Sequence, residues 1–237
     1  MKVILFDLDD TLFDHRHSRR CGLKALQAMH PGLMTVPLEE LEKEHEKQLQ
    51  TNYNKTLDGQ LSVADARLER IRLLSLQYGL HLDLENAKRA VDHYRNIYEA
   101  NRRAVAGAKS LLQHLRGRVK TGVITNGFVA AQRDKLRVCG LENLLTFVLI
   151  SEEVGVKKPD MTIFEEALRR ADVRPEEAIF VGDSWTSDII GAHRCGMKTV
   201  WFNRYGFSCP DSTITTEITS FEPIEKILTL LLQPDST

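Results

Sequence analysis

Five short apolar runs constrain the fold of this 237-residue chain more than any other feature. Each run is nearly continuous and rich in β-branched or aromatic residues, which is typical of strands in a parallel sheet covered on both faces. The runs are Val3–Phe6, Thr121–Ile124, Phe147–Ile150, Ile179–Val181 and Thr199–Phe202. Helical stretches separate the last four, at Val129–Cys139, Ile163–Ala171 and Ser187–Cys195. This alternation predicts a doubly wound, Rossmann-like α/β domain with a parallel sheet.

A long insertion interrupts the alternation, because more than a hundred residues separate the first apolar run from the second. Most of residues 15–103 shows helical periodicity, with repeats at Leu38, Leu41, His45 and Leu49 and again at Leu68, Ile71, Leu74 and Tyr78. We therefore predict a helical cap domain of about four helices over residues 15–104 and a core domain over residues 1–14 and 105–237. Within the cap, residues 57–62 are expected to form a turn that ends at Ser62 as a helix N-cap. The charge run Glu39–Lys47 is expected to form a solvated helix face.

Composition and charge exclude several classes of protein. Lys and Arg total 32 against 33 for Asp and Glu, so the net charge of -1 argues against a broad surface for a nucleic acid polymer. Any phosphate recognition must then be local. The four cysteines lack metal-ligand spacing, and no apolar run is long enough for a signal peptide or a membrane span. We expect a cytoplasmic protein with no membrane partner, and a monomer because no heptad seam is evident.

Polar residues follow four of the predicted strands at the point where each strand ends. In strand order they are Asp7, Asp9, Asp10 and Thr11; Thr125 and Asn126; Lys157 and Lys158, after a short loop; and Asp183, Ser184 and Asp188. In open α/β sheets, ligands bind beyond the carboxyl ends of the strands, near the point where the strand order reverses. These side chains are therefore expected to converge at one edge of one sheet.

The acidic residues at this edge predict a cation site. Asp7, Asp9, Asp183 and Asp188 would place up to four carboxylates in a small volume, where like charges disfavour ionisation. A cation would neutralise them, and ligation by oxygen alone favours a hard ion such as Mg²⁺, which also binds substrate phosphate.

The ordered motifs resemble those of the haloacid dehalogenase-like hydrolases over essentially the whole chain. They are Asp7-Leu8-Asp9-Asp10-Thr11, Thr125-Asn126, Lys158-Pro159 and the segment from Gly182 to Asp188, and the helical insert is similar to the α-helical cap of one large subclass. The segments Ile124–Phe128 and Ile150–Pro159 resemble the branch of pyrimidine 5'-nucleotidases, and proteins similar to N-acylneuraminate-9-phosphatase share some of these elements. The resemblance implies a Mg²⁺-dependent phosphatase.

The resemblance also implies roles for the acidic residues. Asp7 would attack phosphorus to give an aspartyl-phosphate. Asp9 would protonate the leaving alcohol and then deprotonate the attacking water. Asp7, the backbone carbonyl of Asp9, and Asp183 would hold Mg²⁺, and Asp188 would lie behind them and support a metal-bound water or Lys158. Alternatively, Asp188 is an acid that stabilises a helix N-terminus.

The same resemblance implies a phosphate-binding set. Thr125 and the amide of Asn126 would bind phosphate oxygens at a helix N-terminus, although Thr125 alone could be a helix cap. Lys158 would neutralise charge on the phosphate and on Asp7, and its neighbour Lys157 is expected to be solvated. Outside these motifs, His15 and His17 are either solvated hinge residues or contacts to the leaving group, and Trp185 either packs near the metal loop or lines the entrance.

Several functions compete for this pattern. The leading prediction is hydrolysis of a small phosphomonoester, with a nucleoside 5'-monophosphate favoured over a sugar phosphate or N-acylneuraminate 9-phosphate. A phosphomutase of the same fold also uses both acids, whereas hydrolytic dehalogenation has no need of Asp9. A response-regulator receiver would carry its phosphoacceptor after the third strand, where no Asp directly follows Ile150. A non-enzymatic binding module is disfavoured because every expected catalytic residue is present.

Overall fold

The computed structural model describes residues 1–57 and 59–232 and divides the chain into two compact units. The core unit comprises Met1–Asp14 and Arg103–Thr237, and the cap unit comprises His15–Arg102. The sequence places these boundaries after residues 14 and 104.

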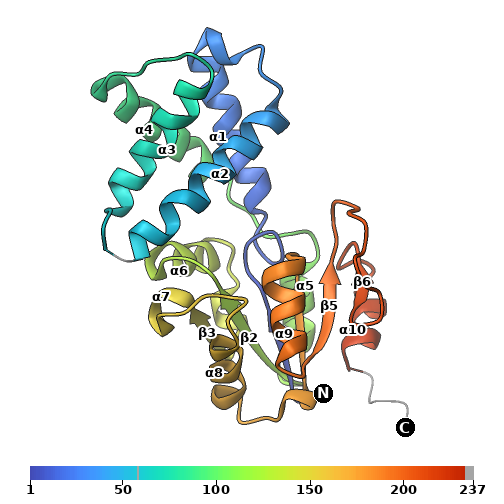
Figure 1. Ribbon diagram of the computed structural model, residues 1–237. Helices are drawn as coiled ribbons and strands as arrows, with labels where there is room; N and C mark the ends of the chain where they lie inside the picture. Colours follow the sequence, from blue (N-terminus) through green and yellow to red (C-terminus); the bar gives the residue numbers. More distant parts are fainter. Residues whose placement is uncertain (58, 233–237) are drawn as a thin grey trace. The chain divides into compact units, whose positions relative to one another are not determined.

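A six-stranded parallel sheet forms the centre of the core unit (Figure 1), in the order β3-β2-β1-β4-β5-β6. The strands are β1 (Val3–Phe6), β2 (Lys120–Thr125), β3 (Phe147–Ile150), β4 (Ala178–Gly182), β5 (Lys198–Phe202) and β6 (Thr216–Ile218). The prediction of a doubly wound α/β core is confirmed, and β1 lies at the centre between β2 and β4. The short edge strand β6 was not predicted, because it offers only three residues, two of them exposed and polar.

Helices flank this sheet. They are α5 (Ala108–Leu115), α6 (Val129–Val138), α7 (Ser151–Val154), α8 (Met161–Ala171), α9 (Ile190–Arg194) and α10 (Ile224–Leu232). Val3 and Leu5 of β1 pack in one apolar cluster with Ile163 and Phe164 of α8. Side chains alternate along a strand, so Ile4 and the other buried residues of β1 face the opposite side of the sheet. Burial on both faces explains why β1 is apolar at every position.

The cap unit contains four α-helices in its described residues, as the periodicity predicts. They are α1 (His15–Met29), α2 (Leu38–Leu57), α3 (Val63–Gln77) and α4 (Leu84–Ala100). Ser62 caps α3 as predicted, since its hydroxyl accepts a hydrogen bond of 3.0 Å from the Asp65 N–H. Asp58, in the predicted turn, lies outside the described residues. An apolar cluster that includes Leu23, Leu41 and Ile71 holds the four helices together.

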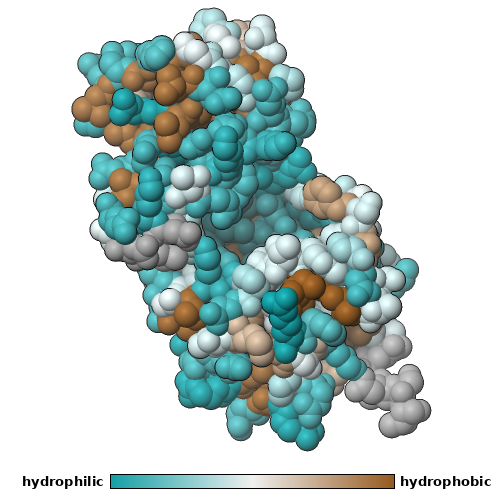
Figure 2. All heavy atoms as spheres, in the orientation of Figure 1, coloured by the Kyte–Doolittle hydropathy of each residue, from teal (hydrophilic) through white to brown (hydrophobic). Residues whose placement is uncertain are grey.

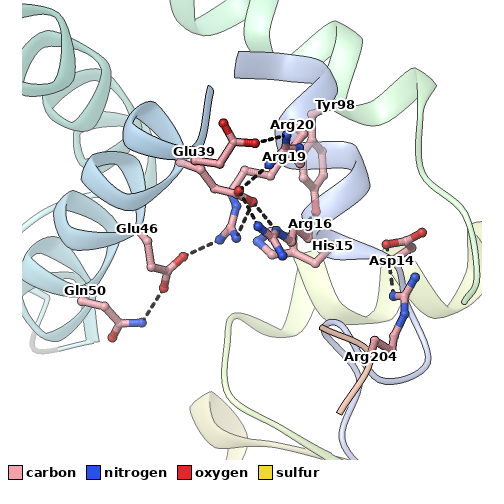
Figure 3. Close-up of polar contacts among 11 residues, drawn as sticks. Asp14, His15, Arg16, Arg19, Arg20, Glu39, Glu46, Gln50, Tyr98 and Arg204 are labelled. Carbon is pink, nitrogen blue, oxygen red and sulfur yellow. Dashed lines mark hydrogen bonds and ion pairs between the residues drawn. The ribbon is translucent and has the colours of Figure 1, made fainter. Parts of the chain in front are cut away.

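A partly buried ion-pair network joins α1 to α2 within the cap (Figure 3). Glu42 is only 6% exposed and receives three arginines from α1: Arg16 at 2.9 Å, Arg19 at 3.1 Å and Arg20 at 2.9 Å. His45, one turn further along α2, is also buried, and its ring packs against Tyr94 of α4. The prediction of a solvated face over Glu39–Lys47 is therefore wrong for Glu42, which faces helix α1 rather than water, whereas the burial of His45 agrees with its place in the predicted apolar repeat.

The two ends of the insertion are joined inside the core unit. Asp14, the last core residue before the cap, is 4% exposed and pairs with Arg103, the first core residue after it, at 2.8 Å. Arg204, from the loop after β5, approaches Asp14 at 3.3 Å (Figure 3). Burial alone would raise the pKa of Asp14, but the two guanidinium groups hold it below its ordinary value.

The molecular surface shown in Figure 2 is mainly hydrophilic, with separate hydrophobic patches. No helix among residues 1–57 and 59–232 has both the length and the apolar character that a membrane crossing requires.

Candidate active site

Asp7 lies at the carboxyl end of the central strand. It directly follows β1, and its N–H donates a hydrogen bond of 2.9 Å to the carbonyl of Val181 in β4. The residue is only 6% exposed. The strands β2 and β3 extend to one side of β1, and β4, β5 and β6 extend to the other. Asp7 therefore stands where the strand order reverses, which is the usual ligand site of such sheets.

Three carboxylates and one lysine meet around Asp7. Single carboxylate oxygens of Asp7, Asp183 and Asp188 all lie within 4.8 Å of one another. The Lys158 ammonium is 2.6 Å from an Asp7 oxygen and 2.8 Å from an Asp188 oxygen, and the residue is only 3% exposed. The structure thus brings together side chains that follow three strands, β1, β3 and β4, and that are far apart in the sequence. Lys158 points inward, whereas Lys157 is half-buried.

The electrostatics of this cluster favour binding of a cation. Burial, together with Asp188, raises the pKa of Asp7 to about 7 although Lys158 opposes the shift. Burial and the neighbouring Asp7 and Asp188 raise the pKa of Asp183 well above its ordinary value. For Lys158, burial would lower the pKa, but the two carboxylates raise it. Carboxylates that resist ionisation at neutral pH accept a divalent cation readily, because its charge restores the ionised form.

Close backbone packing holds Asp188 in the cluster. The residue lies in a short π-helix, Trp185–Ile189, and one of its oxygens accepts a hydrogen bond of 3.0 Å from the Ser184 N–H. Gly182, at the end of β4, leaves room for this turn, since a Cβ there would lie 2.6 Å from the Cβ of Asp188. Only glycine permits this approach.

Tryptophan side chains support the neighbouring Asp183. The indole N–H of Trp201 in β5 donates a hydrogen bond of 2.8 Å to the Asp183 carbonyl. Trp185 packs edge-on against Trp201, with ring centroids 5.3 Å apart. Of the two positions that the sequence left open for Trp185, this contact favours packing beside the loop that carries Asp183.

Asn126 connects the second and third motifs. Its side-chain oxygen accepts a hydrogen bond of 2.8 Å from the Lys158 N–H, and its amide donates one of 3.0 Å to the Lys158 carbonyl. Thr125, at the end of β2, is 1% exposed and lies one residue before it. The side chain of Asn126 therefore positions the backbone of the catalytic lysine candidate, a contact that sequence reasoning did not anticipate.

Asp9 is held by two residues of α6 that the sequence did not single out. The Lys135 ammonium lies 2.7 Å from each Asp9 carboxylate oxygen, and the Gln132 amide donates a hydrogen bond of 3.1 Å to one of them. Gln132 is 1% exposed. Lysine and glutamine on a helix ordinarily indicate a solvated face, so the sequence carries no signal for this contact.

The histidines at the entrance to the cap have partners within the cap. A ring nitrogen of His15 lies 2.8 Å from the Tyr98 hydroxyl, and the two rings pack edge-on. His17 lies 3.8 Å from the sulfur of Cys21, one turn further along α1. The ring of His15 is therefore held by Tyr98 of the same unit.

Comparison with known proteins assigns this chain to a family. Residues 1–196 match the family described as haloacid dehalogenase-like hydrolases. The chain belongs to that family. A glyceraldehyde 3-phosphate phosphatase from Pyrococcus furiosus is 37% identical over 219 residues, which cover 87% of this chain and 82% of the relative. The pyrimidine 5'-nucleotidase YjjG from Escherichia coli is 40% identical over 125 residues, which cover 52% of this chain and 55% of the relative.

A solved structure shares the fold of this haloacid dehalogenase-like hydrolase. The putative HAD-hydrolase YfnB from Bacillus subtilis, bound to magnesium, superimposes with a TM-score of 0.74 at 24% identity, over 97% of this chain and 98% of that one. Within the described part of the present chain, Asp7, Asp183 and Asp188 are the group of three acids close enough to share an ion. Their donors are all carboxylate oxygens, which suits a hard divalent cation.

Proposed function

We propose that this hydrolase cleaves phosphomonoesters through an aspartyl-phosphate on Asp7, with Mg²⁺ as its cofactor. The observation that carries this proposal is the buried Asp7 carboxylate, held 2.6 Å from the Lys158 ammonium within a cluster of three acids. A nucleophilic carboxylate beside a fixed cation and a cation site is the arrangement that phosphoryl transfer requires. Asp7 and Asp183 would hold the ion together with the backbone carbonyl of Asp9. When bound, Mg²⁺ would neutralise charge on the phosphate and on the acids.

The chemistry divides into two displacements. An Asp7 oxygen attacks phosphorus, and the ester P–O bond breaks as Asp9 transfers its proton to the leaving alcohol. Water then attacks the same phosphorus, Asp9 takes the proton, and the bond to Asp7 breaks. Inorganic phosphate leaves and both acids return to their starting states. Asp9 favours this reaction over dehalogenation, which does not need a second acid.

Three groups are proposed to bind the transferred phosphate. Lys158 offers a buried ammonium beside Asp7, and Asn126 fixes its backbone on both sides. Thr125 adds a hydroxyl, and the Asn126 N–H adds a backbone donor. Donors fixed in advance stabilise the charge of the transition state without reorganising.

Two classes of substrate are supported by different observations. The relative with a glyceraldehyde 3-phosphate name matches 87% of this chain, a span that must include much of the cap. The match to the pyrimidine nucleotidase has a higher sequence identity, 40% against 37%, but it covers only 52% of the chain. Caps of this kind select the leaving group, so coverage of the cap favours a short sugar phosphate, whereas the motif segments favour a nucleotide.

A panel of phosphate-release assays tests the proposal. Glyceraldehyde 3-phosphate, pyrimidine nucleoside 5'-monophosphates, N-acylneuraminate 9-phosphate and p-nitrophenyl phosphate are compared with Mg²⁺ and with EDTA. We expect turnover that requires the metal and a kcat/KM at least about tenfold higher for one class of natural ester. Phosphate transfer to a second sugar without release would instead indicate a mutase. No hydrolysis of any ester with Mg²⁺ would contradict the proposal.

Replacing Asp9 tests the proposed proton transfer. We expect Asp9→Asn to lower kcat/KM for alkyl phosphates by about 10²- to 10⁴-fold, because the alkoxide is a poor leaving group without its proton. The loss should be much smaller for p-nitrophenyl phosphate, whose leaving group needs no proton. Steady-state kinetics with both esters provide the measurement. Equal losses on the two esters would contradict a role for Asp9 as general acid.

The pKa shifts predict that Mg²⁺ binding depends on pH. Because the pKa of Asp7 in the metal-free protein is raised to about 7 and that of Asp183 is also raised, protons compete with the ion as the pH falls through 7. We expect binding at pH 6 to release on the order of one proton per ion and to tighten toward pH 8. Titration calorimetry in two buffers of different ionisation enthalpy measures this release. Heats that are identical in both buffers would disprove it.

A further inference from the structure

We propose that Lys135 is a positioning residue for catalysis, which aligns Asp9 and stabilises the charge that develops on Asp9 as its proton moves to the leaving group. This inference rests on the proposed function, since it gives Asp9 the role of general acid. Lys135 belongs to none of the four motifs, and it lies on α6, outside the strand ends that carry them.

The geometry of the pair is specific. The Lys135 ammonium lies 2.7 Å from both oxygens of the Asp9 carboxylate, and the Lys135 side chain is only 12% exposed. The same ammonium lies 5.3 Å from the centre of the Phe13 ring, in the turn that follows Asp9. The Lys135 ammonium contacts both oxygens of one carboxylate in a mainly buried site. The other ion pairs of α6, such as Arg133 with Glu153, are more exposed.

Gln132 completes the alignment and connects it to the proposed phosphate site. Its amide nitrogen lies 3.1 Å from Asp9, 2.7 Å from the Thr125 hydroxyl and 2.9 Å from the Asn126 carbonyl. Gln132 and Lys135 are three residues apart on α6, so both side chains leave the same face of the helix. One helix face therefore contacts both the proposed acid and the proposed phosphate-binding residues.

The charge of Lys135 suits the direction of proton transfer. As the ester P–O bond breaks, the proton moves from the Asp9 carboxyl to the leaving oxygen, and Asp9 becomes an anion. When Asp9 carries its proton, a fixed ammonium at hydrogen-bond distance stabilises the anion that the transfer produces more than the neutral acid, which lowers the barrier to the transfer from that form. The effect should therefore depend on how much the leaving group needs a proton.

The test compares two esters in Lys135→Met, with Lys135→Arg as the conservative rescue and Arg133→Met as the matched control. Arg133 lies on the same helix, is more exposed and pairs with Glu153 rather than with Asp9. For Lys135→Met we expect kcat/KM to fall about 10- to 100-fold on an alkyl phosphate and less than about threefold on p-nitrophenyl phosphate. Competitive inhibition by inorganic phosphate should not change. Lys135→Arg should recover most of the loss, and Arg133→Met should behave as wild type.

A double-mutant cycle with Asp9→Asn separates a positioning role from a structural one. If Lys135 acts through Asp9, adding Lys135→Met to Asp9→Asn should cost less than about threefold more on the alkyl ester. Equal losses on the two esters, or full additivity in the cycle, would overturn the proposal. If Lys135→Met does not fold, as judged by circular dichroism, Lys135→Gln is measured in the same way. Failure of the proposed function would appear separately, as a wild-type protein that hydrolyses neither ester.

Discussion

Replacing Asp7 with asparagine is expected to abolish turnover of p-nitrophenyl phosphate, with a loss of kcat on the order of 10⁴-fold or more. The amide of asparagine is a poor nucleophile and cannot form the acyl phosphate. This ester has a good leaving group, so formation of the aspartyl-phosphate from it does not need a proton from Asp9, and the loss reports on Asp7 rather than on the general acid. The fold should be retained, because asparagine has nearly the same shape and removes a buried charge.

The measurement combines kinetics with trapping of the intermediate. Rapid acid quench of the wild-type protein with ³²P-labelled substrate should yield a phosphoprotein, and Asp7→Asn should yield none. Asp92→Asn, an exposed position on α4 in the cap, is the matched control and should retain full activity. Circular dichroism checks the fold of each variant. Retained turnover by Asp7→Asn would refute the assignment of the nucleophile.

Replacing Glu42 with glutamine is expected to destabilise the cap by about 3 kcal/mol. The change leaves three arginines of α1 around a side chain that no longer carries a negative charge. Burial would raise the pKa of Glu42, but the arginines lower it, so the carboxylate is the form that the cap contains at neutral pH. Partly buried cations that lose their counter-ion repel one another and remain poorly solvated.

Two optical probes can distinguish the cap from the core. Both tryptophans of the chain, Trp185 and Trp201, lie in the core unit, so tryptophan fluorescence reports on the core alone. In urea, Glu42→Gln should lose helical circular dichroism before the fluorescence changes. Glu44→Gln removes an ion pair with the exposed Lys47 and should change the free energy of unfolding by less than about 0.5 kcal/mol. Coincident and unshifted transitions for Glu42→Gln would contradict the expectation.

The strands of the core could be predicted because the buried positions of a strand are mostly occupied by apolar residues, which is visible in the sequence. The central strand β1 is buried at all four positions, and a strand packed on both faces must be apolar throughout. The strand β6 could not be found in this way, because an edge strand of three residues with exposed Thr216 and Glu217 leaves no apolar run.

The contacts of polar residues on helices were the part that sequence reasoning missed. Glu42 lies in a charge run that predicts solvent, yet three arginines of a neighbouring helix enclose it. Lys135 and Gln132 likewise have the composition of a solvated helix face, yet both reach Asp9. Periodicity reports which face of a helix is apolar, but it does not report which other element the polar face meets.

For this protein, the sequence alone determined the class of fold and the side chains available at the carboxyl edge of the sheet. Both follow from local rules, because a buried strand must be apolar and the residue after a strand must lie at its end. The tertiary structure decided which of those side chains meet. It placed Lys158 between Asp7 and Asp188, and it brought Lys135 to Asp9 from a helix 126 residues away. Such pairings depend on how strands and helices pack across long sequence separations, which no local pattern of residues records.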